Sequence, residues 1–374
     1  MAKKIFITIG VIAVIAIGVF VWLNYCNKKQ EIVKIGAILP LSGDVAVYGN
    51  NTKKGIDLAV EEINKAGGIN GSKVEIIYED SKADPKTGVT AMYKLMENKV
   101  QAIIDNSVSS VALAIAPIGD KNKVVVLSTG STNPNLSGIS PYFFRIWNSD
   151  DLEGKLSARF AIDSLNLSKA AIMYVNNDYG NGLCKVFSNE FKNKGGQVLN
   201  QESYEQGSND FKTQLAKIKA NNVDVLYIAG YSKENATIIK QARELKINCQ
   251  FIGTVTMEDK TIIDIAGKAA DGVIYPYPKD PDINNPTVSN FRKNFKAYYN
   301  EDIAITCDVG YDAVYLIAKA ISLGNSSGEG IKNGLNAIKV YEGASGVIEF
   351  DKNGDVNKPM QFKKISENNF VNLK

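Results

Sequence analysis

The stretch IGAILPLSGDVAVYGNNTKKGIDLAVEEINK, residues 35–65, predicts the first structural unit and the pattern of the rest of the chain. It begins within an apolar run, residues 33–39, that has the length of a β-strand. A proline, a serine and a glycine then open a loop. Ile56, Ala59 and Ile63 recur every three or four residues, which indicates an amphipathic helix that two glycines end. The unit is therefore strand, loop, helix.

The loop of this unit lies at the carboxyl end of its strand and carries Ser42 and Tyr48. In open α/β sheets, small ligands bind at that edge. Hydroxyls and an aromatic ring are suited to holding a ligand, and the loop has no strong catalytic group. We interpret it as part of a binding site.

Strand-like and helix-like segments alternate along the whole chain. Alternation of this kind predicts parallel sheets with helices on both faces. A second cycle starts near Asp150, and a length of 374 residues suits two globular lobes. The expected fold class is therefore α/β, with two Rossmann-like, doubly wound lobes.

Residues 35–85 resemble the start of the substrate-binding proteins of branched-chain amino acid (leucine/isoleucine/valine) ABC importers, which have the type I periplasmic-binding fold. The resemblance covers roughly residues 32–362. Four further motifs carry it in order: VNNDYGNGL (175–183), SNDFKTQL (208–215), VDVLYIAGY (223–231) and GYDAVYLIAKAI (310–321). It implies two lobes joined by a three-stranded hinge.

The resemblance also implies where the chain passes between lobes, near Asn148, Pro276 and Glu342. On that basis residues 1–30 form a signal or membrane-anchor segment. Residues 31–148 plus 277–341 form the first lobe, and residues 149–276 plus 342–374 form the second.

Composition excludes several classes of function. The chain has no histidine, which excludes a histidine-based triad and a histidine-ligated metal site, and its net charge of +3 gives no basic patch for nucleic acid. The four cysteines are far apart without a CxxC pair, so we expect no thiolate metal site. Whether Cys184 and Cys249 pair stays open. The positions of a disulfide found in many relatives hold Ala83 and Val108, so that bridge is absent.

The N-terminus is a targeting segment. Two lysines precede the largely apolar residues 5–23, a length close to a membrane span. The sequence Leu-Asn-Tyr-Cys at 23–26 resembles a lipobox, in which Cys26 would be lipidated after cleavage. The alternative is an uncleaved anchor. Both place the chain from Gln30 onward outside the cytoplasm and tethered to the membrane.

Motifs for catalysis and nucleotide binding fail on their context. GNSSG (324–328) has the letters of a nucleophile elbow, but a predicted helix precedes it and no histidine exists. Residues 351–362 begin like a calcium loop, but Val356 replaces the required glycine and Phe362 the required glutamate. The Gly-Lys pairs lack a following Ser or Thr, so there is no P-loop. We expect no enzyme activity, cofactor or metal.

Two loops at predicted strand ends carry hydroxyls and free backbone N–H groups: residues 106–110 and 128–132. Such positions favour an anion through unsatisfied donors and the helix dipole. The resemblance implies that Ser109, Gly130 and Thr132 hold the carboxylate and ammonium of a ligand, with both hydroxyls donating to the carboxylate. It also implies an aromatic wall that consists of Tyr48, Tyr179 and Tyr231.

Two positions depart from the family pattern. The acid that pairs with the ligand's ammonium is replaced by Val255 or Thr256, and the nearest acids are Glu258 and Asp259. We expect Glu258 to take over that role. A further pocket aromatic is replaced by Thr306 or Cys307. The pocket is altered, so the ligand stays open.

Together these features predict a monomeric solute-binding protein, tethered outside the cytoplasm. It would capture a small solute, most simply an amino acid, and deliver it to the membrane permease of an ABC importer. Two alternatives stay open: a membrane-tethered sensor ectodomain, or a binder of an organic acid or amide.

Overall fold

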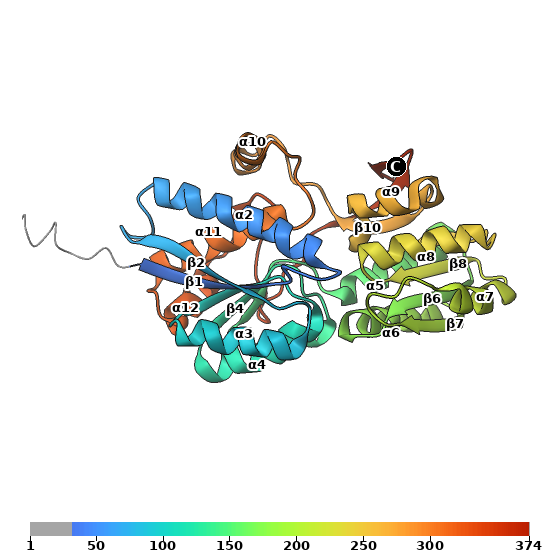
Figure 1. Ribbon diagram of the computed structural model, residues 1–374, viewed down its shortest axis with the longest axis horizontal. Coiled ribbons are helices and arrows are strands. Elements are labelled where there is room, and N and C mark those ends of the chain that lie inside the picture. Colours follow the sequence, from blue (N-terminus) through green and yellow to red (C-terminus); the bar gives the residue numbers. More distant parts are fainter. Residues whose placement is uncertain (1–31, 374) are drawn as a thin grey trace, which may run out of the picture.

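The structure is a computed structural model and describes residues 32–373. Two α/β lobes lie side by side along the long axis of the molecule (Figure 1). Each is built on its own sheet, one of five strands and one of seven, with helices packed against it. The predicted fold class, two doubly wound α/β lobes, is confirmed.

The first lobe has a fully parallel sheet with the order β2-β1-β3-β4-β5. Its strands are β1 (Ile32–Leu39), β2 (Lys73–Asp80), β3 (Ala102–Asp105), β4 (Val125–Ser128) and β5 (Phe143–Arg145). Its helices are α2 (Ala46–Lys65), α3 (Pro85–Glu97), α4 (Ser109–Asn122), α10 (Pro286–Tyr299), α11 (Cys307–Leu323) and α12 (Gly328–Ala337). A short 3-10 turn (Pro134–Leu136) and the hairpin of β11 (Tyr341–Gly343) and β12 (Gly346–Ile348) complete it.

The second lobe has the sheet order β14-β13-β10-β9-β8-β6-β7, with the last two strands of the chain antiparallel. Its strands are β6 (Lys169–Val175), β7 (Gln197–Tyr204), β8 (Val225–Ala229), β9 (Gln250–Ile252), β10 (Ile274–Pro278), β13 (Met360–Ser366) and β14 (Asn369–Asn372). Its helices are α5 (Asp150–Arg159), α6 (Asp178–Asn193), α7 (Lys212–Ala220), α8 (Ser232–Glu244) and α9 (Lys260–Ala266). Short helical turns span Phe160–Ser164, Val255–Met257 and Gly267–Ala270.

Helix α2 shows why the opening stretch decides this fold. Ile56, Ala59 and Ile63, its regularly spaced apolar residues, are all buried against the first-lobe core. Gly55 faces helix α11 so closely that a Cβ atom there would stand 1.8 Å from the carbonyl oxygen of Cys307. Only glycine permits that approach. The helix is thus fixed on its sheet and against α11, and its N-terminal end projects toward the other lobe (Figure 1).

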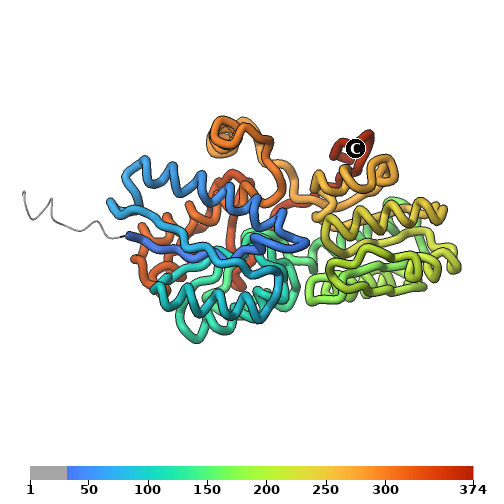
Figure 2. Tube along the Cα trace, viewed as in Figure 1, coloured from blue at the N-terminus to red at the C-terminus, as the bar shows by residue number. Residues whose placement is uncertain are grey.

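Three segments connect the lobes (Figure 2). The first follows β5 and contains Asn148, where a crossing was expected. The second follows β10. Pro276 is itself a residue of that strand and pairs with Phe362 in the second sheet. We therefore place the second crossing after Pro278, slightly later than predicted.

The third crossing also lies later than expected. The predicted boundary, Glu342, is part of a hairpin whose end is held by the first lobe. The backbone N–H groups of Ala344 and Ser345 donate to the carboxylate of Asp312 on α11, at 2.7 and 2.8 Å. Asp355 accepts from the guanidinium of Arg145 on β5 at 2.6 Å. We infer that the chain leaves the first lobe only at residues 357–359, because long-range contacts that a local pattern does not reveal hold it there.

Two of the connecting segments are hydrogen-bonded to each other. The side-chain amide of Asn148 donates to the carbonyl of Lys358 at 2.9 Å, and its oxygen accepts from the Lys358 N–H at 2.8 Å. The Lys358 ammonium is buried and donates to the hydroxyl of Ser345 at 2.7 Å. Burial lowers the pKa of Lys358. The hinge is therefore a hydrogen-bonded unit.

We expect Asn148→Ala to lower the free energy of unfolding by about 1–3 kcal/mol, because it leaves a buried N–H and a buried carbonyl of Lys358 without partners. Urea unfolding followed by circular dichroism measures this change. Asn122→Ala is the matched control: this exposed amide caps the carbonyl of Ile118, and its loss should cost less than about 0.5 kcal/mol. Equal changes in the free energy of unfolding for the two variants would show that the hydrogen bonds of Asn148 stabilise the protein no more than an exposed helix cap does.

Candidate functional site

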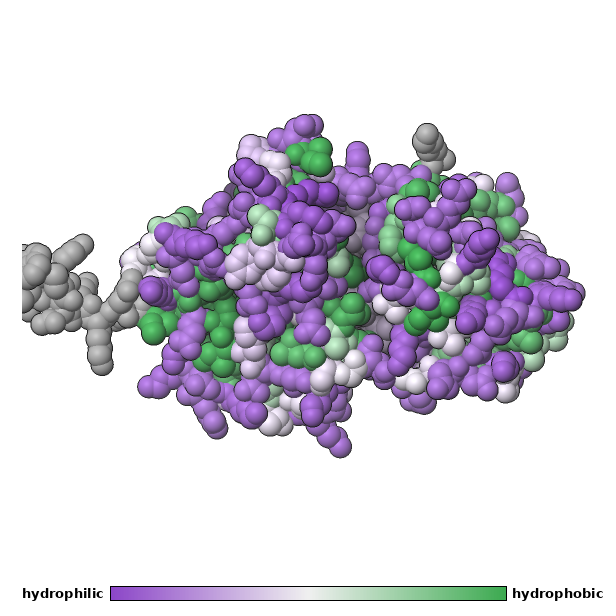
Figure 3. Space-filling model, turned by 45° about the horizontal axis from the view of Figure 1, so that its top comes forward, coloured by the Kyte–Doolittle hydropathy of each residue, from purple (hydrophilic) through white to green (hydrophobic). Residues whose placement is uncertain are grey.

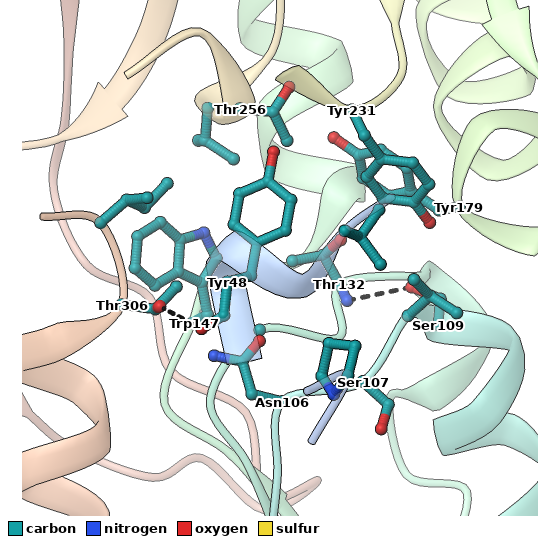
Figure 4. Close-up of a pocket in the computed structure, with 16 residues that line it drawn as sticks. Tyr48, Asn106, Ser107, Ser109, Thr132, Trp147, Tyr179, Tyr231, Thr256 and Thr306 are labelled. Atoms are coloured by element: carbon teal, nitrogen blue, oxygen red, sulfur yellow. Dashed lines mark hydrogen bonds between the residues drawn. The ribbon is translucent and has the colours of Figure 1, made fainter. Parts of the chain in front are cut away.

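A pocket lies between the lobes, at the carboxyl edge of the first-lobe sheet (Figure 4). The space between its walls is about 560 Å³, part of it open to solvent. Within the described part of the chain, every residue that lines it is uncharged. These residues are Pro40, Val45, Tyr48, Asn106, Ser107, Val108, Ser109, Gly130, Thr132, Trp147, Tyr179, Tyr231, Val255, Thr256, Ile305 and Thr306.

Most of the ligand-binding residues expected from the sequence meet in this one pocket. They come from both lobes: Tyr48, Ser109, Gly130 and Thr132 from the first, and Tyr179 and Tyr231 from the second. All follow the carboxyl ends of strands, as the loop argument requires. That they contact a ligand stays a prediction.

Glu258 is placed elsewhere. Its carboxylate pairs with the ammonium of Lys363 on β13 and accepts from the hydroxyl of Tyr275 on β10, outside the lining of the pocket. A carboxylate that already has a cation and a hydroxyl as partners is not available to a ligand's ammonium. The expectation that Glu258 takes over from the acid of the family is therefore corrected.

Ser109 presents a proton donor to the pocket. Its Oγ accepts hydrogen bonds from the backbone N–H groups of Thr132 and Asn133, both at 3.2 Å. Its own proton therefore points away from these donors and is free to donate. Ser109 is also the first residue of α4, so the partial positive charge of a helix N-terminus adds to the effect. This end of the pocket suits an anion such as a carboxylate.

Thr132 was expected to donate to a carboxylate as Ser109 does, but its surroundings favour the opposite polarity. Its Oγ1 is buried and lacks a hydrogen bond of good geometry to any described residue. It lies beside the carboxyl of Asp150, and hydrogen bonding from Thr132 lowers the pKa of that carboxyl, whereas burial, the larger effect, raises it to about 7. A small rotation of Thr132 allows its proton to reach Asp150. The lone pairs of Oγ1 then remain for a donor in the pocket.

Aromatic rings form the apolar part of the pocket (Figure 4). Tyr179 and Tyr231 stack with ring centroids 5.4 Å apart, and Tyr48 lies 6.3 Å from Tyr231. The hydroxyl of Tyr179 donates to Thr254 at 3.1 Å, and that of Tyr231 accepts from the amide of Asn177 at 3.1 Å. Burial raises the pKa of each phenol, so all three stay neutral. The rings therefore provide hydrophobic area rather than charge.

Several lining residues were missed by sequence reasoning. Trp147 and Ile305 line the pocket but were not selected, and Asn106 and Ser107 line it from a selected loop without having been named as ligand-binding residues. Trp147 could have been found from its position directly before the first crossing, because residues at a crossing lie between the lobes. Thr306 lines the pocket, as its match to a family aromatic suggested, and its hydroxyl donates to the carbonyl of Tyr48 at 3.0 Å.

Contacts between the lobes close the pocket on several sides. Oγ of Ser232 lies 2.5 Å from the hydroxyl of Tyr48, and an ion pair joins Lys233 to Asp44 at 2.8 Å. On another side, the amide of Asn133 donates to the carbonyl of Asp178 at 2.6 Å. A groove follows the line where the lobes meet on the face shown in Figure 3. The structure is therefore a closed arrangement of the two lobes.

A model of the periplasmic binding protein family matches residues 32–369. The chain belongs to the periplasmic binding protein family. Membership places the protein outside the cytoplasm and gives it the role of binding a small solute for an ABC transporter.

Individual relatives agree over nearly the whole chain. A Leu/Ile/Val-binding protein homologue of Brucella suis is 28% identical over 96% of this chain and 95% of its own. The leucine-binding protein LivK of Thermotoga maritima superposes with a TM-score of 0.86 at 29% identity, over 91% of this chain and 98% of LivK. LivJ of Streptococcus pneumoniae, solved in complex with isoleucine, gives 0.84 at 26% identity, over 91% and 98%.

Other expectations from the sequence can be compared with residues 32–373. Cys184, Cys249 and Cys307 are free thiols, so the pairing of the first two that had been left open does not occur. No cluster of three potential metal-ligating side chains is found in this part of the chain. None of its helices has the length and apolar character needed to span a membrane. Cys26 and the anchor segment lie outside the described residues.

We expect Tyr48→Phe to shift the lobes toward an open form by about two-fold to ten-fold in the equilibrium constant, because it removes a buried hydrogen bond between them. The backbone N–H of Asp178 is a suitable reporter, since it donates across the boundary to Ser110 at 3.3 Å. Its hydrogen exchange should accelerate by that factor. Tyr298→Phe, at an exposed tyrosine, should leave it unchanged. If the exchange rate of the Asp178 N–H were the same in Tyr48→Phe as in Tyr298→Phe, Tyr48 would not hold the lobes together.

Proposed function

We propose that this protein captures an α-amino acid with a branched aliphatic side chain and delivers it to the permease of an ABC importer. The observation that carries the proposal is the polarity of the pocket: a proton donor at Ser109, an acceptor position at Thr132, and an apolar wall of tyrosines. A zwitterion with an apolar side chain matches all three. The names of the Brucella relative and of the two structural neighbours support the same ligand class.

The ligand's role in this proposal is to favour the closed arrangement. A ligand shifts a two-state equilibrium only by its differential affinity for the two states. The pocket walls come from both lobes, so a ligand contacts Tyr179 and Tyr231 together with Ser109 only when the lobes are closed. The permease would then distinguish the loaded, closed protein from the open one.

A carboxylic acid without an amine is the second candidate ligand, and one observation favours it. No charged side chain of the described residues lines the pocket, and Glu258 is engaged with Lys363. A ligand with an apolar body and a single carboxylate would satisfy the Ser109 end and require nothing at Thr132.

We also propose that the protein is a monomer anchored to the membrane by its N-terminal segment. The apolar residues 5–23 and the lipobox-like sequence ending at Cys26 support this proposal. In this location the lobes would remain close to the permease without any contact holding them there.

We expect leucine to bind more tightly than 4-methylpentanoate, its analogue without the amine, in isothermal titration calorimetry. Thr132→Val should weaken leucine binding by about ten-fold to a hundred-fold, the value of a hydrogen bond to a charged group, and should barely change the binding of the analogue. Ser109→Ala should weaken both ligands, because each has a carboxylate.

Thr90→Val is the matched control for the threonine variant, since the exposed hydroxyl of Thr90 bonds only the carbonyl of Lys86 within α3. It should leave both affinities unchanged. Equal affinities of the wild-type protein for leucine and 4-methylpentanoate would contradict the amino acid assignment and support the second candidate.

Membrane anchoring has a separate test. We expect the full-length protein to fractionate with membranes, and Cys26→Ala to release or misprocess it if Cys26 carries the lipid. A variant that remains membrane-bound at full length, as the wild type does, would instead identify residues 5–23 as the anchor. Cys249→Ala, at a half-buried thiol in the second lobe, is the control for loss of a cysteine.

A further inference from the structure

Two acidic residues lie behind the pocket wall, one helical turn apart at the start of α5. Asp150 is fully buried and Glu153 is 2% exposed. Each lies behind a lining residue. The N–H of Asp150 donates to the carbonyl of Thr132 at 2.9 Å, and Oε1 of Glu153 accepts from the N–H of Val255 at 3.0 Å. The pair therefore touches the walls contributed by both lobes.

Asp150 lacks the partners that a buried carboxylate needs. Neither of its oxygens has a hydrogen bond of good geometry to a described residue. The N-terminus of α5 supplies only a partial positive charge. Buried charges are otherwise paired or hydrogen-bonded, because leaving them unpaired costs several kcal/mol. A positive charge near Thr132 would therefore stabilise the ionised form of Asp150.

Arg145 cannot supply that charge through a hydrogen bond, although it is the nearest cation. A guanidinium has five N–H donors. Here two bond the carboxylate of Asp355, at 2.6 and 3.1 Å, and a third bonds Ser137 at 2.6 Å. The remaining two bond the carbonyls of Thr132 and Asn133, at 3.0 and 3.1 Å. No donor is left for Asp150.

The other groups that face the pair are neutral or acidic. Tyr179 on α6 and Tyr227 on β8 lie close enough that both carboxyls raise the pKa of their phenols, which burial has already raised. Burial and then the charge of Asp150 raise the pKa of Glu153, and Arg145 lowers that of Asp150 through space. Two buried carboxyls that repel each other, with one distant cation, favour a state in which one of them stays protonated.

We propose that Asp150 and Glu153 are specificity-determining residues, one of which stays protonated in the ligand-free pocket, and that this proton is released to solvent when a ligand's ammonium arrives at Thr132. The ammonium then supplies the positive charge that the cluster lacks, and Thr132 lies between the two. The inference rests on the proposed amino acid function and deepens it: the charge that reads the ammonium lies behind the pocket wall rather than in it. Both acids are positioning residues that act through the wall.

Proton release has a measurable sign. Below about pH 7, near the raised pKa of Asp150, the pair keeps its proton, and ligand binding must displace it. The affinity for leucine should therefore rise by up to about ten-fold per pH unit as the pH increases toward 7, and then level off. The affinity for 4-methylpentanoate should not rise, because it brings no positive charge.

The test is calorimetry of the full-length protein with both ligands from pH 5.5 to 8.5, in buffers of different ionisation enthalpy that report the released proton. We expect Asp150→Asn and Glu153→Gln each to weaken leucine binding by ten-fold or more at pH 8. Both should flatten its pH profile and leave 4-methylpentanoate unchanged. Asp151→Asn is the matched control, since that carboxylate lies on the same turn but is exposed and paired with Lys155. Urea unfolding confirms that each variant folds.

Leucine binding that is independent of pH in the wild type, and unchanged by Glu153→Gln, would overturn the inference while the proposed function stands. If neither ligand binds, the proposed function fails. The pair can still be judged by ¹³C NMR of the aspartate and glutamate carboxyls in the ligand-free protein. We expect one carboxyl of the wild type to titrate well above the ordinary range. This raised titration should disappear in both variants. Ordinary titration of all carboxyls would overturn the inference.

Discussion

The buried ion pair between Arg145 and Asp355 is the contact on which the rest of the site depends. Arg145 stands at the end of β5, at the edge of the first-lobe sheet, and Asp355 lies on the segment that leads to the third crossing. The same guanidinium holds the carbonyls of Thr132 and Asn133. A buried charge is costly unless all of its donors are satisfied, and here all of them are. Any displacement of the ligand-binding loop would break this set, so Arg145 ties the position of Thr132 to the segment that leads into the third crossing.

Local patterns predicted what local physics determines. The period of Ile56, Ala59 and Ile63 identified α2, and alternating strands and helices identified the class of both lobes. The loops that carry Ser109 and Thr132 could be selected because loops that follow parallel strands meet at one edge of the sheet, and the family resemblance then identified the two residues. The distance between the two side chains, and whether each hydroxyl donates or accepts, could not be predicted from the sequence. Both depend on contacts, such as those of Ser109 with two backbone N–H groups, that appear only after folding.

The errors have a shared physical origin in pairings between distant parts of the chain. Glu258 was expected in the pocket because it follows the position of the family's acid, but Lys363, on the last strands of the second sheet, pairs with it. Glu342 was taken as a crossing, but Asp312 and Arg145 keep the following residues on the first lobe. Each partner is far away in sequence, and nothing in the composition around either acid distinguishes a paired carboxylate from a free one.

The polar contacts between the lobes contribute little free energy each. The ion pair between Asp44 and Lys233 is exposed at 39% and 52% of its side chains, and such pairs contribute about 0–1 kcal/mol. The buried contact of Tyr48 with Ser232 adds about 0.5–1.5 kcal/mol. In this arrangement Thr132 Oγ1 and the Asp150 carboxyl are buried without a hydrogen-bond partner among the described residues, and each such group costs about 1–3 kcal/mol. A shift from one per cent to ninety-nine per cent closed needs about 5.5 kcal/mol of differential affinity. A ligand that supplies the missing partners removes the cost and gains its own contacts at once, so recognition of the ligand and closure of the lobes draw on the same groups.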